Sequence, residues 1–193
     1  MYISKIVPQD LTEVVSMHVE RIPYSISSQA GRARLLRLYS HFLKQNNFYS
    51  YSASDGKNGK LLGFITGITS LKNVFRISIT TIRPSDFTKI AKSNLSLIDF
   101  LDAIEVSQFI AKEKLDYFYI TAWCANSDES NKSVGLTLLK QIRDFSFSIG
   151  VNRILVDTRK SNRRALTKYQ QFGFVEIKAS KLSRILELRL GNS

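Results

Sequence analysis

Hydrophobic and polar positions along the first part of the chain predict a strand followed by a helix. Residues 2–7 alternate as in a short strand, and the apolar positions after Asp10 recur every three or four residues, the spacing of one helix face. Asp10 followed by Glu13 has the spacing of a capping box. We therefore expect this helix to begin at Asp10 and to stop near Pro23.

A polar loop, residues 23–28, is expected to separate this helix from a second one. The predicted apolar face of the second helix carries Leu35, Leu36, Tyr39, Phe42 and Leu43. Its basic residues, expected largely off that face, are Arg32, Arg34, Arg37 and Lys44. Residues 48–53 and 60–67 have strand composition, and the turn residues between them predict an antiparallel hairpin.

The second half of the chain alternates strands and helices after a stretch from about 70 to 116, which we interpret as a helical insertion. Within it, Pro84-Ser-Asp86 is typical of a helix start, and residues 97–114 are long enough for another helix. The elements expected after it are strands at 117–125, 154–159, 174–177 and 182–190, with helices ending at Gly150 and spanning 162–172. This order predicts a single mixed α/β domain over residues 1–193.

Composition narrows the class of protein to a soluble globular domain. The chain has 193 residues, of which 44% are hydrophobic and 11% aromatic, so it can bury a sizeable core. Cys124 is the only cysteine, which excludes internal disulfides and multi-cysteine metal sites. No segment has the apolar stretch of a signal peptide or the roughly 18 apolar residues of a membrane span. We expect a cytoplasmic protein with no metal and no membrane partner.

The positive charge is concentrated in the last third of the chain. The formal net charge is +12, and residues 132–193 hold 13 Lys and Arg against 4 Asp and Glu, a local net charge of +9. Such a field favours a polyanionic partner, which can be a nucleic acid, an acidic membrane surface or a phosphate-rich cofactor. Because the region lacks interleaved aromatic residues and a recognisable nucleic-acid-binding motif, a nucleic-acid partner is not favoured.

The sharpest motifs lie in this basic region. Gly150-Val-Asn-Arg-Ile-Leu-Val-Asp157 is followed by Asn162-Arg-Arg-Ala165 and then by Tyr169-Gln-Gln-Phe-Gly-Phe174. From residue 117 to 177 the chain resembles the GNAT superfamily of N-acetyltransferases, which transfer acetyl groups from acetyl-CoA to amines. The resemblance implies a GNAT-like α/β (α+β) fold, whose mixed, mostly antiparallel central sheet is split and flanked by helices. The helical insertion would lie between the third and fourth strands.

The expected phosphate-binding loop departs from the family pattern of Arg or Gln, two residues, Gly, one residue, then Gly or Ala. Aligning Leu138-Leu139 with the family's leucine pair puts Ser130, Ser133 and Gly135 at these positions. A shifted alignment that uses Lys132 restores the cation but misplaces the leucines. Small residues suit this loop because main-chain N–H groups at a helix N-terminus must approach the pyrophosphate closely. The alternative is an ordinary capped connection between a strand and a helix.

The resemblance implies acetyl-CoA as co-substrate and assigns its contacts by motif position. Main-chain groups of Trp123, Cys124 and Ala125 would pair with the pantetheine arm, and Asn162 would hold CoA, cap its own helix, or both. The Cys124 side chain is interpreted as a small buried hydrophobe rather than a nucleophile. The complete implied set is Trp123, Cys124, Ala125, Ser130, Lys132, Ser133, Val134, Gly135, Asn162, Ala165 and Lys168.

Acetyl transfer to an amine needs a neutral amine and a proton donor for the departing thiolate. The resemblance implies Tyr169 as that donor, because a phenol with a pKa of about 10 stays protonated at neutral pH. The alternative is an amphipathic aromatic residue at the edge of its helix. The strand at 117–125 has no acidic residue, so the base is left open.

His18, on or beside the inward face of the first helix, is a candidate for the base, with a half-buried structural histidine as the alternative. A chain of water molecules to bulk solvent could also accept the proton. Glu20, Tyr24 and Ser25 follow it in the region that usually forms the acceptor wall of this fold. Carboxylates of the insertion either attract a cationic acceptor or face solvent. They are Asp99, Asp102, Glu105, Glu113 and Asp116.

The expected function is transfer of an acetyl group to a primary amine by direct attack in a ternary complex. A nucleotide-linked amino sugar is the first candidate acceptor, and a protein or peptide amine is the nearest alternative. A catalytically silent acyl-CoA-binding regulatory module is an alternative from another class. The expected partners are CoA and a small-molecule amine, and a homodimer is left open.

Overall fold

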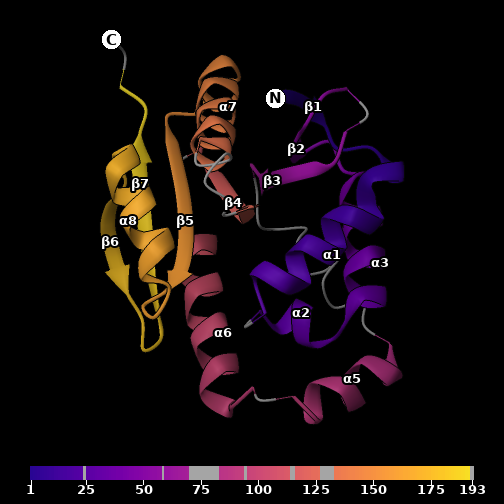
Figure 1. Ribbon diagram of the computed structural model, residues 1–193. Helices are drawn as coiled ribbons and strands as arrows, with labels where there is room; N and C mark the ends of the chain where they lie inside the picture. The colour runs from indigo at the N-terminus through magenta and orange to yellow at the C-terminus, as the bar shows by residue number, and fades with distance from the viewer. Residues whose placement is uncertain are drawn as a thin grey trace.

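The fold is a seven-stranded sheet with helices on both faces (Figure 1). The computed structural model describes residues 1–23, 25–57, 59–69, 83–93, 95–113, 116–126 and 133–191. Within them the strand order is β1-β2-β3-β4-β5-β7-β6. β4 and β5 pair in parallel, and all other neighbours pair antiparallel. The expected mixed, mostly antiparallel sheet is confirmed.

The elements lie close to their predicted positions. The strands are β1 Tyr2–Lys5, β2 Phe48–Ser54, β3 Leu61–Ile68, β4 Phe118–Ala125, β5 Arg153–Arg159, β6 Val175–Ala179 and β7 Ser183–Arg189. The helices are η1 Pro8–Asp10, α1 Leu11–Arg21, α2 Ile26–Gln29, α3 Arg32–Phe42, α5 Pro84–Ala91, α6 Leu97–Lys112, α7 Val134–Ser148 and α8 Arg163–Phe172. The short helix α2 stands where the sequence predicts a polar loop, and α5 and α6 lie between β3 and β4.

Three expectations about the N-terminal helices are wrong. The Asp10 carboxylate does not cap α1, because it accepts a hydrogen bond from the Val7 amide at 2.9 Å across the preceding turn. On α3, Leu36 is exposed and Leu38 is buried in its place, and Arg34 is buried although its charge predicts the polar side. α3 is therefore covered over more of its circumference than a single amphipathic stripe predicts.

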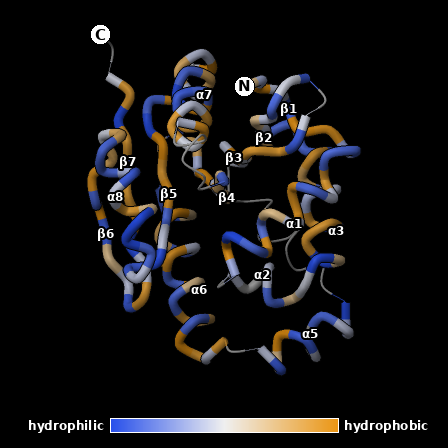
Figure 2. The backbone as a smooth tube through the Cα atoms, in the orientation of Figure 1, coloured by the Kyte–Doolittle hydropathy of each residue, from blue (hydrophilic) through white to orange (hydrophobic). Residues whose placement is uncertain are grey.

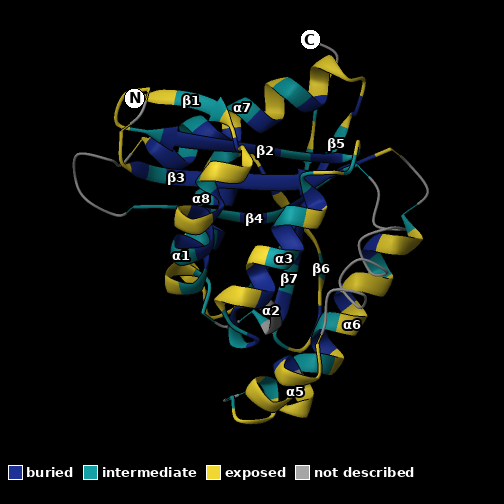
Figure 3. Cartoon of the chain, turned by 90° about the vertical axis from the view of Figure 1, so that its right-hand side faces the viewer, coloured by how far each residue is buried: buried dark blue, intermediate teal, exposed yellow. Residues whose placement is uncertain are grey.

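Different helices cover the two faces of the sheet. Phe64 and Ile65 are neighbours on β3 and point to opposite faces. The Phe64 face packs against α1 and α3, and the Ile65 face packs against α7. In the C-terminal half, α6 packs against Leu155 of β5 and Ile185 of β7. Figure 3 shows β2 and β3 buried, whereas α5 and α6 expose much of their surface.

β4 and β5 form the only parallel pair among the described strands, and they pair over just three residues. Pairing begins with Phe118 opposite Ile154 and ends with Ile120 opposite Val156. β4 then continues for five residues and β5 for three without facing each other. The central split that the family resemblance implies is therefore located at Ile120.

A β-bulge lies at the same point of β4. Thr66 of β3 faces Ala122 and the adjacent Gly67 faces Ile120, so Thr121 is the extra residue. The Thr121 hydroxyl lies 2.9 Å from that of Thr66. A bulge bends its strand and increases the local twist, so it turns β4 away from β5 where their pairing stops.

Hydrogen bonds to a buried carboxylate fasten α6 to the C-terminal strands. Asp102 accepts from the Ser180 hydroxyl at 2.7 Å and from the Ser183 hydroxyl at 2.6 Å. It also accepts from the Leu182 amide at 2.6 Å. Burial acts to raise the Asp102 pKa, but these three bonds outweigh it and the pKa is lowered. Asp102 therefore holds the helix against the turn between β6 and β7 as a charged group.

Other carboxylates of the insertion also reach the basic C-terminal third. The ion pairs are Asp99–Arg159 at 2.5 Å, Glu113–Arg153 at 2.8 Å and Glu105–Lys178 at 3.4 Å. For Asp99, Asp102 and Glu113 the expectation of a solvent-facing surface is wrong. Part of the +9 charge on the last third is thus matched locally by α6.

Gly67 gives a test of how tightly the bulge is packed. A Cβ atom at this position would lie 2.1 Å from Phe118 Cε1, and the Phe118 ring is fully buried. We expect Gly67→Ala to lower the free energy of unfolding by about 2–3 kcal/mol, measured by urea denaturation. Gly191→Ala is the control because its Cβ would meet no atom within 4 Å. Equal stability of the two variants would contradict the packing described.

Candidate active site

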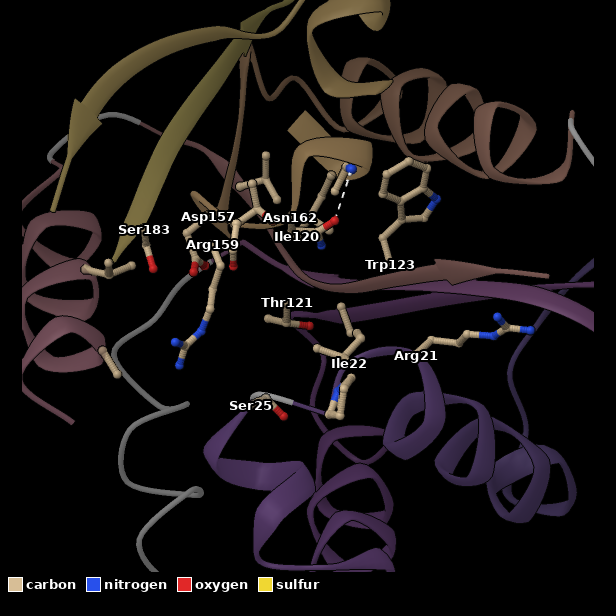
Figure 4. Close-up of a pocket in the computed structure, with 18 of the residues that line it drawn as sticks. Arg21, Ile22, Ser25, Ile120, Thr121, Trp123, Asp157, Arg159, Asn162 and Ser183 are labelled. Carbon is tan, nitrogen blue, oxygen red and sulfur yellow. Dashed lines mark hydrogen bonds between the residues drawn. The ribbon is translucent and has the colours of Figure 1, made fainter. Parts of the chain in front are cut away.

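A cavity of about 760 Å³ opens where β4 and β5 separate (Figure 4). Its walls come from β4, β5, α6, the start of α8 and the segment that follows α1. Figure 4 shows Asp157 and Arg159 on the β5 side, across from Ile22 and Ser25. The volume lies within the range of about 300–1,000 Å³ that is common for small-molecule sites. No group of three or more His, Cys, Asp or Glu in the described part of the chain is placed to hold a metal ion.

A second cavity of about 180 Å³ adjoins the first and extends to the start of α7. The two share Arg21, Trp123 and Asn162 among their lining residues. The charged residues that line the smaller cavity are Arg21, Arg164 and Lys168, and all three are cationic. The smaller cavity is therefore suited to an anionic group.

Trp123 brings the start of α7 close to β4. Its indole Nε1 donates to the Gly135 carbonyl at 3.1 Å, and a Cβ on Gly135 would lie 2.9 Å from Trp123 Cζ2. Glycine is thus needed at 135 for contact with the indole, a reason that the motif alone does not show. Ser133 precedes α7 and makes no side-chain capping bond. The expected site residues Tyr24, Ser130 and Lys132 lie outside the described residues.

Asn162 sits at the start of α8 and caps it. Its side-chain oxygen accepts a hydrogen bond from the Ala165 amide at 3.2 Å, drawn as the dashed line in Figure 4. The interpretation of Asn162 as a helix cap is confirmed. Asn162 and Ala165 both line the two cavities, so the cap stands where they meet.

Tyr169 reaches the larger cavity from α8 and is 4% exposed. Its ring packs against Trp123 and Phe174, with centroid distances of 4.9 Å and 5.2 Å. Burial raises the pKa of the phenol, and the negative charge of Asp157 raises it further. The hydroxyl therefore carries its proton throughout the neutral range, as a proton donor must.

Asp157 is a cavity residue that the sequence analysis did not identify as functional. It lies on β5, lines the larger cavity, and accepts a short hydrogen bond from the hydroxyl of Tyr119 on β4. Burial raises the pKa of the Asp157 carboxyl group. The sequence offered one clue to its role, because Asp157 is the acidic residue that directly follows the apolar residues 154–156 of the predicted strand. The proximity of Tyr119, 38 positions earlier in the chain, is set by the fold.

Two of the expected acceptor-wall residues line the larger cavity. Glu20 lies at its edge and forms an exposed ion pair with Arg32 at 3.6 Å. The Ser25 hydroxyl donates to the Ser28 hydroxyl at 2.8 Å. Asp99, which the insertion adds to the wall, has its pKa lowered to about 2 by hydrogen bonds from Ser96 and by Arg159.

His18, by contrast, does not line either cavity. Its Nδ1 lies 2.7 Å from the Tyr39 hydroxyl, and its ring stacks on Phe64. Burial lowers the His18 pKa to about 4. These contacts favour the structural alternative for His18, although its Nε2 also lies 3.5 Å from the hydroxyl of Ser25, which lines the larger cavity.

Comparison with known proteins agrees with this geometry. A family model for the acetyltransferase (GNAT) family matches residues 17–174. The chain is similar in structure to Arabidopsis thaliana NAA60 in complex with a bisubstrate analogue, with 15% identity, coverage of 100% of this chain and 99% of that one, and a TM-score of 0.60. The chain is also similar in structure to the ribosomal-protein-S18-alanine N-acetyltransferase of Escherichia coli, with 14% identity, coverage of 100% of this chain and 95% of that one, and a TM-score of 0.56.

A third similar structure is an aminoglycoside 6'-acetyltransferase type Ii, with 12% identity, coverage of 100% and 99%, and a TM-score of 0.61. Likeness at these identities shows the fold alone. No significant match was found among curated proteins. In the described part of the chain, no helix has the length and apolar character needed to cross a bilayer.

The buried histidine gives a prediction for the pH dependence of stability. The His18 pKa is about 4 in the folded chain and 6.5 in the unfolded chain, so the unfolded chain takes up the proton first as the pH falls. Stability is thereby lost from pH 6.5 down to about 4. We expect His18→Gln to remove about 3 kcal/mol of this loss, measured by urea unfolding at pH 7 and pH 4. An identical pH dependence in wild type and variant would contradict the assignment.

Proposed function

The chain belongs to the GNAT acetyltransferase family, and from that premise we propose that it transfers an acetyl group from acetyl-CoA to a primary amine. The reaction takes place in the cavity between β4 and β5. The observation that carries this proposal is the buried phenol of Tyr169, which faces the gap between two strands that have ceased to pair. The gap supplies a place for the donor, and the phenol supplies a proton.

The residues around the gap fit acetyl-CoA. Among the described strands, none pairs beyond Ile120 with the edge of β4 that faces β5, and main-chain amide groups there need hydrogen-bonding partners. The amides of pantetheine meet that need along Trp123, Cys124 and Ala125. The cationic smaller cavity, with Lys168, lies where these residues approach α7 and is suited to the phosphates. Acetyl-CoA supplies an acetyl group that is already activated as a thioester.

In this proposal Tyr169 of α8 and Asn162, which caps α8, have different roles. Tyr169 gives its proton to the departing CoA sulfur, which avoids release of a free thiolate. Asn162 fixes the start of the helix that carries Tyr169, because its side chain caps α8. The packing of the Tyr169 ring against Trp123 holds the phenol beside the β4 edge where pantetheine binds.

The acceptor proposed is a small polar amine, with an amino sugar as the first candidate and its nucleotide-linked form included. The cavity has the volume of a small-molecule site, and α6 closes one side of it. Its carboxylates favour a cationic, hydroxyl-bearing acceptor, while the arginines offer a place for phosphate. The carboxylates are Glu20, Asp99, Asp102 and Asp157, and the arginines are Arg21, Arg159 and Arg164.

Binding and turnover separate this proposal from its rivals. We expect calorimetry to show acetyl-CoA binding, and a thiol assay to show CoA release with amino sugars and nucleotide-linked amino sugars. If CoA is released only with peptides that carry a free N-terminus, the acceptor is a peptide amine and not an amino sugar. Binding without release on any amine would identify a silent acyl-CoA-binding module, and absence of binding would remove the proposed function.

Tyr169→Phe tests the proton donor. We expect kcat to fall about 100-fold because the thiolate then leaves without its proton, with the KM for acetyl-CoA changed less than about twofold. The measurement is steady-state CoA release. Tyr2→Phe is the matched control, since Tyr2 is an exposed residue of β1 far from the cavity lining. Unchanged turnover in Tyr169→Phe would contradict the assignment of Tyr169 as the proton donor.

A further inference from the structure

Deprotonation of the acceptor amine is the step for which the residues considered so far provide no base. An alkyl ammonium has a pKa of about 10.4, so at neutral pH a proton must be removed before the nitrogen can attack. His18 does not line the larger cavity, although its Nε2 lies 3.5 Å from the hydroxyl of the lining residue Ser25, and burial lowers its pKa to about 4. Four carboxylates line the larger cavity, and their surroundings differ. They are Glu20, Asp99, Asp102 and Asp157.

Three of the four carboxylates are already engaged by other groups. The Glu20 side chain is 62% exposed and paired with Arg32. Asp99 has a pKa of about 2, held down first by the Ser96 hydroxyl. Asp102 is tied by three hydrogen bonds, and its pKa is lowered. Asp99 and Asp102 are thus held ionised and have little affinity for a further proton.

Asp157 differs in both position and environment. It follows Val156, the last residue of β5 that pairs with β4, so it stands at the apex of the gap. It lines the same cavity as Tyr169, from which the thiolate is to be protonated. Burial raises its pKa, which makes the carboxylate a better proton acceptor at neutral pH than an ordinary aspartate.

Tyr119 holds this carboxylate from outside the cavity. Its hydroxyl donates to Asp157 Oδ1, and Tyr119 does not belong to the cavity lining. The pKa of the Tyr119 phenol is raised well above its ordinary value, by burial first and by the Asp157 charge second. The proton of this pair therefore stays on Tyr119, and the carboxylate remains the basic partner. A carboxylate accepts several hydrogen bonds, so Oδ2 can serve a second donor.

The remaining charges near Asp157 come from the elements that surround it. Asp102 on α6 acts to raise its pKa and Arg159 on β5 acts to lower it, while Tyr169 faces it from α8. Arg159 is itself paired with Asp99 at 2.5 Å. The other charged residues of the cavity wall are Glu20, Arg21 and Arg164.

From this arrangement we infer that Asp157 is the general base that takes the proton from the acceptor ammonium, and that Tyr119 is the residue that positions its carboxylate. The inference rests on the proposed acetyl transfer. The ammonium N–H bond breaks and its proton moves to Asp157. The nitrogen lone pair then forms the new C–N bond as the C–S bond breaks, and the sulfur takes a proton from Tyr169.

The second proton of the attacking nitrogen restores Tyr169, and Asp157 releases its proton to solvent. The balance is therefore one ammonium and one thioester consumed, with one amide, one thiol and one proton formed. This assignment places the base on β5 and the acid on α8, the helix that follows β5.

Asp157→Asn is the direct test, because the amide keeps the shape and can still accept from Tyr119. We expect kcat/KM for the amine to fall at least 100-fold at pH 7. The wild-type rate should level off above the pKa of Asp157, whereas the rate of the variant should keep rising about tenfold per pH unit toward the pKa of the amine. Calorimetric binding of acetyl-CoA should not change.

Stability distinguishes this role from a structural one. A carboxyl whose pKa is raised on folding destabilises the folded chain at pH values above its unfolded pKa. Asp157→Asn should therefore be as stable as wild type or more stable at pH 7, while losing activity. Asp144→Asn is the matched control, since Asp144 is an exposed residue of α7 paired only with its neighbour Arg143 among the described contacts.

Tyr119→Phe provides a second, independent variant. Loss of its hydrogen bond raises the pKa of Asp157, so the acid limb should move to higher pH, an effect that a packing role alone does not produce. Wild-type kcat/KM and an unchanged acid limb in Asp157→Asn would overturn the inference. Failure of the proposed function is a different result, in which the wild-type protein releases no CoA with any amine.

Discussion

The early end of pairing between β4 and β5 is the constraint on which the rest of the structure depends. The strands part after Ile120, next to the bulge at Thr121, and beyond that point the facing edges of β4 and β5 are not paired with each other in the described structure. The Phe118 ring occupies the space over Gly67 and keeps the bulge in register. The larger cavity lies at this point, lined by residues of β4 and β5 from both sides of the gap.

Electrostatic matching between distant segments completes the cavity. Carboxylates of α6 and of Glu113, just after it, meet basic and hydroxyl groups of the C-terminal strands, so the helix forms a wall of the larger cavity. Figure 2 shows hydrophilic stretches of α8 beside the more hydrophobic β5. The basic residues of the last third of the chain therefore fall into two groups. Arg153 and Arg159 pair with α6, while Arg164 and Lys168 line the smaller, cationic cavity.

The sequence predicted what depends on local spacing. Helix and strand positions, the hairpin, the cap at Asn162 and the place of Tyr169 follow from periodicity and from a family-like motif within one segment. It did not predict what depends on pairing between remote segments. The burial of Arg34 and the inward side of α6 are set by elements far along the chain. Asp157 gains its place only when β4 and β5 part and Tyr119 reaches it across the pair.

The central claim is that the gap between β4 and β5 receives the pantetheine arm of acetyl-CoA. Trp123 is the only tryptophan of the chain and lines both cavities, so its fluorescence reports on this gap alone. The direct measurement is a fluorescence titration with acetyl-CoA beside calorimetry under the same conditions. The account predicts a saturable change in Trp123 emission with the calorimetric dissociation constant. Calorimetric binding without any change in emission would contradict it.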